Sequence, residues 1–177
     1  SSKILWDIVK VGMPASLSMA IMAMGQGVFN KILINYSSET VAAYQVAGRI
    51  DMLVFLPIFA IAGSMTTLVG MFYGAREINA LNQIIYYGLK CSFFITLISS
   101  LVVYLFAESF SSIFTKDQEI INVSAGFLHL LCLVYPLVSI AITSGRIMQG
   151  LGKGIPVLII TIVRVLGISA PLAVFFS

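Results

Sequence analysis

The chain has 177 residues, of which 59% are hydrophobic and only 10% are charged. Soluble domains carry about 25% charged residues, so this composition excludes an ordinary water-exposed surface and indicates a chain surrounded by lipid. The formal net charge of +3 comes from scattered Lys and Arg residues without a basic cluster, which argues against nucleic acid as a partner.

Long apolar stretches separated by short polar loops predict an all-α, polytopic transmembrane helix bundle. A helix needs about 20 apolar residues to cross the hydrocarbon core of a bilayer. No stretch alternates with the period of two that marks a membrane-spanning strand. The predicted spans, which form a single transmembrane domain over residues 1–177, are 9–35, 52–73, 84–107, 120–143 and 155–176.

The first predicted span carries two amides, Gln26 and Asn30, which a helix places on one face because they are four residues apart. They either hydrogen-bond to a neighbouring helix or line a polar cavity. Met22 lies nearby, together with Met19 and Met24. Methionine surfaces are polarisable and adaptable, which suits varied apolar ligands as well as simple gap-filling.

Polar side chains gather before the second predicted span. Gln45 and Arg49 are again four residues apart, and Asp51 directly precedes the apolar stretch that begins at Met52. A structural ion pair between Arg49 and Asp51 and a ligand site at the mouth of the span both fit this pattern. We expect no Asp or Glu in the interior of any span.

The later spans hold isolated polar groups. His129 lies in the fourth span and is either a packing histidine or a proton relay. Arg164 lies near the middle of the fifth span and must face protein or water, because exposure of Arg to lipid is costly. Pro136 removes a helical hydrogen bond and frees the carbonyl of Cys132, which needs another partner inside a membrane.

The distribution of Lys and Arg predicts the orientation. The N-terminal segment and the second and fourth loops carry six of these residues, and the first and third loops carry three. The positive-inside rule therefore places the N-terminus in the cytoplasm of a multi-pass inner (plasma) membrane protein. Five spans leave the C-terminus outside, and we expect a sixth span to be missing from this chain.

Catalytic and metal-binding patterns are missing from the sequence. There is a single His, no HExxH or GxSxG motif, and the Gly-rich "QGLGKGIP" lacks the spacing of a phosphate-binding loop. Cys91 and Cys132 lie in apolar stretches without ligand spacing. We expect a protein that is not an enzyme and that holds no cofactor or metal.

Three segments resemble the MATE (multidrug and toxic compound extrusion) family. They are "KVGMPASL", "VAAYQVAGRIDMLVFLPIFAIAGSMTTLVGMFYGA" and "GRIMQGLGKGIP". The most specific part is the A-x-Q-V-A start joined to the V-G-x-x-x-G-A end of the second segment. The resemblance covers nearly the whole chain and is to the second half of the family, helices seven to eleven of twelve.

Members of this family are secondary antiporters of the MOP superfamily that expel drugs and organic cations in exchange for protons or sodium ions. Their cavity lies between two six-helix lobes. The resemblance therefore implies a partial C-terminal lobe whose partners are small-molecule drugs, the lipid bilayer and the missing N-terminal lobe. It implies these substrate-binding residues along the cavity: Met22, Gln26, Asn30, Gln45 and Arg49. The candidates for proton- or ion-linked groups are His129 and Arg164.

One departure concerns the coupling ion. Sodium-coupled bacterial members carry a glutamate in the first span of this half and an aspartate in the fourth. Met22 and Val138 stand at the corresponding positions here, and neither side chain binds a cation electrostatically. We therefore expect the coupling carboxylate in the absent first half, and no transport by this chain alone.

Two alternatives remain. A lipid-linked oligosaccharide flippase of the same superfamily would need several cations for a pyrophosphate, and only Arg49 and Arg164 are candidates. A structural membrane protein without any transport role would give no ion-dependent efflux.

Overall fold

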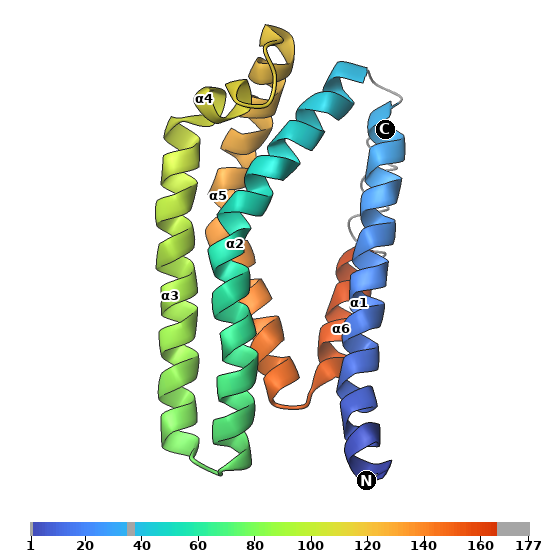
Figure 1. Cartoon of the computed structure of the whole chain (residues 1–177), viewed down its shortest axis with the longest axis vertical. Coiled ribbons are helices and arrows are strands. Elements are labelled where there is room, and N and C mark those ends of the chain that lie inside the picture. Colours follow the sequence, from blue (N-terminus) through green and yellow to red (C-terminus); the bar gives the residue numbers. More distant parts are fainter. Residues whose placement is uncertain (1, 35–37, 166–177) are drawn as a thin grey trace.

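The computed structural model describes residues 2–34 and 38–165, and these residues are helical apart from short turns (Figure 1). The predicted all-α fold class is confirmed. The helices are α1 (Ser2–Ile34), α2 (Ser38–Gly74), α3 (Ile78–Leu105), α4 (Ala107–Ser112), α5 (Gln118–Gly150) and α6 (Gly154–Ile162).

Three helices are long and apolar enough to cross a membrane, within the ranges that the structure describes. They cover Glu39–Gly74, Ile78–Leu105 and Gln118–Gly150, and they contain most of the second, third and fourth predicted spans. The first predicted span falls largely within α1. The fifth predicted span is described only as far as Val165, and its remainder lies outside the described residues.

Helix α2 differs from its prediction because it begins at Ser38, well before Met52. Gln45, Arg49 and Asp51 therefore lie inside the helix and do not precede it. In the sequence, the two charges mark the predicted start of the span. However, a charged side chain can lie within a long helix when a neighbouring helix supplies a partner. The expectation that no span contains an interior acid is wrong for Asp51.

The helices pack as two groups that are joined by the α1–α2 and α5–α6 connections. Helices α2, α3 and α5 pack against one another, and the short α4 lies across one end of this bundle, whereas α1 packs chiefly against α6. The start of α1, the α2–α3 turn and the α5–α6 turn lie at the same end of the molecule (Figure 1). Successive long helices therefore run in alternating directions between the two ends of the molecule, which agrees with helices that cross a membrane in turn.

Helices α2 and α5 run parallel, which their cross-helix contacts show. Near the start of both helices, the rings of Tyr44 and Phe127 meet edge to face with centroids 6.3 Å apart. Near their ends, the Thr66 hydroxyl donates to the carbonyl of Arg146 at 3.2 Å. The two helices thus stay in contact over most of their length.

Helix α3 runs antiparallel to α5, and hydroxyl groups join the two. Ser92 and Thr143 share a hydrogen bond of 2.8 Å, and the Ser100 hydroxyl donates to the carbonyl of Cys132 at 2.5 Å. That carbonyl is the one freed by Pro136, so the expectation that it needs another partner is confirmed.

The interior of the molecule combines apolar residues with hydroxyl-bearing ones, while many large apolar side chains lie outside. Every buried polar residue in the described part is a Ser or a Thr. Close backbone approach and interhelical hydrogen bonds hold helices together in lipid, because lipid tails are as apolar as leucine. The buried polar residues are Ser18, Ser92, Thr96, Ser100, Ser111, Ser124, Ser139, Thr143 and Thr161.

The turns that end α2 and α5 have the same geometry. In each, a left-handed residue follows the helix and two amides return to the last carbonyls, which is the Schellman motif. The left-handed residue is Gly152 (φ 75°) after α5 and Arg76 (φ 61°) after α2. The segment around Gly152 is therefore an ordered helix end, and it leads directly into α6.

Candidate functional site

The predicted cavity residues of α2 lie on its outer face. Gln45 and Arg49 are exposed, whereas Ala47, Ile50 and Val54 on the opposite side are buried in a hydrophobic cluster. The spacing of four residues therefore places the amide and the cation together, as the sequence predicts. Both lie on the surface that the described helices leave uncovered.

Arg49 does not form the ion pair that the sequence analysis considered. Its guanidinium carbon lies 5.9 Å from the centroid of the Phe114 ring, in the turn after α4. Asp51 points to another helix, because residues two apart do not face each other on a helix. Arg49 thus anchors the α4–α5 turn by a cation–π contact.

The predicted cavity residues of α1 are also exposed where the structure describes them. Met22 and Gln26 lie on the surface one turn apart. The contact face of α1 is different: Ser18 is buried, and a Cβ atom at Gly25 would lie 2.8 Å from Val165 Cγ1 at the end of the α6 segment. The side chain of Asn30 lies outside the described residues.

The two candidates for ion-linked groups have different surroundings. The Nε2 atom of His129 lies 3.1 Å from the carbonyl oxygen of Tyr104, and the two rings are in contact. A carbonyl only accepts, so Nε2 donates and completes the last turn of α3, whose carbonyls lack helical partners. His129 therefore packs against the end of α3. Arg164 is exposed at the edge of the described range.

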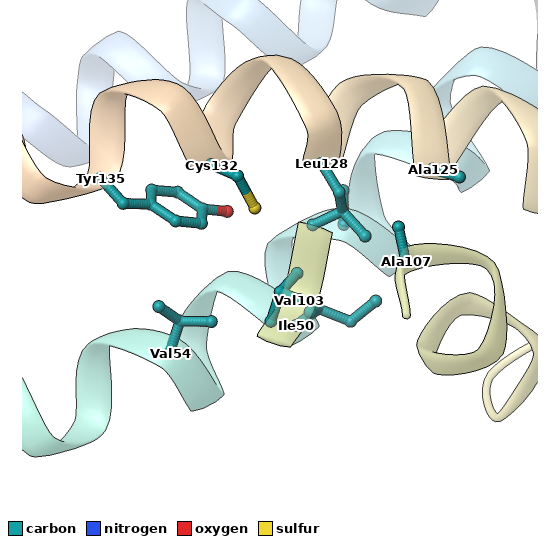
Figure 2. Close-up of a cluster of buried hydrophobic side chains, with 9 residues drawn as sticks. Ile50, Val54, Val103, Ala107, Ala125, Leu128, Cys132 and Tyr135 are labelled. Atoms are coloured by element: carbon teal, nitrogen blue, oxygen red, sulfur yellow. The ribbon is translucent and has the colours of Figure 1, made fainter. Parts of the chain in front are cut away.

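Asp51 is the polar group whose placement the sequence analysis missed. The Tyr135 hydroxyl of α5 donates a hydrogen bond to Asp51 Oδ1 across the α2–α5 contact. Figure 2 shows Tyr135 and Cys132 pointing from α5 towards Ile50 and Val54 of α2. One signal could have revealed this position. Apolar residues keep the same helical spacing upstream of both charges, which indicates that the helix continues there as well.

A groove lies at the other end of the α2–α3 pair. It has a volume of about 410 Å³ and contains none of the predicted site residues. Its walls are largely apolar, as is much of the surface around it. It is lined by Met65, Leu68, Gln83, Ile84, Tyr86, Tyr87 and Gly88.

Metal-ligand geometry is absent from the part of the chain that the structure describes, where no three His, Cys, Asp or Glu side chains come together. The arrangement instead offers two kinds of chemistry. One is an exposed polar and thioether surface on α1 and α2. The other is a partly buried carboxylate held by a tyrosine between α2 and α5.

Comparison with known proteins gives one consistent family. The chain matches the MatE family over residues 14–175. It is 27% identical to the probable multidrug resistance protein NorM of Thermotoga maritima, over 94% of this chain and 36% of that protein. It is 23% identical to the probable multidrug resistance protein YoeA of Bacillus subtilis, over 96% of this chain and 37% of that protein.

Solved structures give the same result at higher identity. An outward-facing multidrug resistance MATE family transporter of the MOP superfamily matches with a TM-score of 0.90 and 31% identity, over 99% of this chain and 40% of that one. A MOP superfamily transporter from Pyrococcus furiosus, described as having a binding pocket of reverse polarity that suggests a different function, matches with a TM-score of 0.91 and 31% identity. That match covers 99% of this chain and 40% of the other. The chain thus spans about two fifths of the transporters it resembles.

Proposed function

The chain belongs to the MATE family, and we propose that it forms part of the second lobe of a secondary antiporter that exports drugs or organic cations. It is a multi-pass membrane protein, and its relatives are named as multidrug resistance proteins and not as enzymes. Protons or sodium ions from outside the cell supply the driving force. The N-terminus is cytoplasmic in the plasma (inner) membrane, as the distribution of Lys and Arg favours.

The observation that carries this proposal is the polar surface on α1 and α2. Gln26 and Met22 on α1 and Gln45 and Arg49 on α2 are exposed on helices that also expose many large apolar side chains. Polar groups that face lipid are costly, so such a surface belongs against protein or water. It therefore forms the wall of the substrate cavity opposite the other lobe, with Asn30 on the same helix.

The chemistry of this wall suits compounds of mixed polarity. The amides both donate and accept hydrogen bonds, and methionine adapts to apolar groups of different shape. Arg49 is held by Phe114 and places a positive charge at the end of the wall near α4. The flippase alternative is not favoured, since the relatives are named for multidrug resistance and this surface offers a single cation in its described part.

A drug-efflux assay tests the proposal. The protein that contains this chain is expressed in a strain without its own exporters, and retention of a panel of dyes and drugs is measured. Gln26→Ala and Gln45→Ala should change the range or affinity of exported compounds more than they change protein abundance.

Gln83→Ala is the matched control, because Gln83 is exposed on α3 away from the proposed wall. It should leave the drug range unchanged. An equal loss of abundance in the Gln26 and Gln45 variants, without a change in drug range, would show that these amides serve packing and would contradict the proposed wall.

A further inference from the structure

Asp51 and Tyr135 lie deep in the membrane-spanning part of the bundle. Helix α5 has no charged residue between Glu119 and Arg146. At 1.5 Å per residue, Tyr135 lies about 24 Å along the helix from Glu119 and about 16 Å from Arg146. Because the Tyr135 hydroxyl binds Asp51, the carboxyl group lies at the same depth.

Helix α3 gives the same depth independently. Its uncharged stretch runs from Lys90 to Glu108, and Ser100 near the middle of that stretch binds the carbonyl of Cys132. Cys132 is one turn from Tyr135 on α5. Two helices therefore place the carboxyl group within the hydrocarbon layer, where an acid is rare and marks a functional group together with its partner.

The surroundings of Asp51 do not balance a negative charge. The Tyr135 hydroxyl is its hydrogen-bond donor, and apolar groups lie nearby, with the buried Ile50 and Val54 on either side along α2 and the ring of Phe55 against Tyr135. No cation reaches the carboxyl group among the described residues. An ionised carboxylate in such a place is expensive unless a proton or another cation neutralises it.

The titratable neighbours of Asp51 come from α2 and α5. From α5 the neighbours of Asp51 are Tyr135 and Cys132, and from α2 itself Tyr44. Arg49 lies over Phe114 on another face of α2. The α3 and α4 residues of the adjoining hydrophobic cluster are Val103, Ala107 and Phe110, none of which titrates, and His129 is bound to the α3 carbonyl of Tyr104.

We propose that Asp51 is a proton-binding site of this lobe and that Tyr135 is its positioning residue. A proton from water binds a carboxylate oxygen and neutralises it, and its release returns the charge, which the Tyr135 hydroxyl then stabilises by donating a hydrogen bond. Asp51 is only partly buried, so the described helices do not seal it off. The use of this proton for export rests on the antiport function proposed above, whereas its binding does not.

A proton fits this site better than a sodium ion. Hard cations are held by several oxygen ligands, whereas the carboxyl group of Asp51 is bound here by the hydroxyl of Tyr135. A proton needs a single oxygen.

Infrared difference spectroscopy on the protein that contains this chain, reconstituted in lipid, tests the proposal. The carbonyl stretch of a protonated carboxyl group is recorded as the pH is raised. We expect Asp51→Asn to remove one such band and Glu77→Gln, an exposed acid in the α2–α3 turn, to leave it unchanged. An unchanged band in Asp51→Asn would overturn the proposal, even if drug export were normal.

A second variant keeps the test valid if Asp51→Asn fails to fold. Tyr135→Phe retains the ring against Phe55 but removes the donor, so the band should be lost at a different pH than in the native protein. Loss at the same pH would overturn the positioning role, and loss of the band on adding sodium at constant pH would overturn the proton assignment. A band that depends on Asp51 in a protein that exports no drug would refute the proposed function alone.

Discussion

Replacing Gly150 with alanine tests the parallel contact of α2 and α5. Gly150 is the last residue of α5, and a Cβ atom there would lie 2.6 Å from the carbonyl oxygen of Thr66 and about 3.1 Å from Cβ of Val69 on α2. The first of these atoms is backbone, so it cannot move aside as a flexible side chain would. One of the two helices must therefore shift.

The size of the effect follows from this overlap. Forcing one extra methyl group into a well-packed contact costs about 1–3 kcal/mol. The shift would also strain the hydrogen bond from the Thr66 hydroxyl to the Arg146 carbonyl. We therefore expect Gly150→Ala to lower the free energy of unfolding by about 1–3 kcal/mol.

Gly126→Ala in the same helix is the matched control, because a Cβ atom at Gly126 meets nothing within 4 Å. Alanine is the better helix former, so this variant should gain about 0.5–1 kcal/mol. The free energy of unfolding of both variants is measured in the same detergent by denaturant titration. Equal and small effects of the two substitutions would show that α2 and α5 do not meet at Gly150, which would refute the packing described above.

The remaining predictions concern helix ends and a bent helix. Arg76→Gly should raise the free energy of unfolding by about 1 kcal/mol, because glycine adopts the left-handed conformation without strain, and Gly152→Ala should lower it by a similar amount. Opposite signs in thermal melts check both, and equal signs would contradict the turn geometry. Ser100→Ala should cost about 1–3 kcal/mol, since the Cys132 carbonyl loses its donor inside the bundle. Ser112→Ala at an exposed position is the control, and equal effects would contradict that role.

The sequence predicts the helices well because the need for about 20 apolar residues per span is a local property. It predicts their ends less well. Arg49 and Asp51 interrupt the apolar stretch, yet α2 continues through them from Ser38. Whether a charge ends a span depends on what lies opposite it, and the partner of Asp51 is 84 residues away in the chain.

The candidate site shows the same limit. Spacing of four residues placed Gln45 beside Arg49, and the structure agrees that both lie on the outer face of α2. Spacing alone could not distinguish a ligand group from the Arg49 contact with Phe114, nor assign His129 to the Tyr104 carbonyl. These contacts depend on how α3, α4 and α5 are arranged in space, which no local pattern contains.

Transport by the reconstituted protein tests the proposed antiport function most directly. The protein that contains this chain is placed in lipid vesicles, and movement of a fluorescent drug is followed while proton and sodium gradients are imposed one at a time. We expect drug movement that follows one of the two inward ion gradients and stops when that gradient is dissipated. Drug movement that ignores both gradients, or none with any compound of a broad panel, would contradict it.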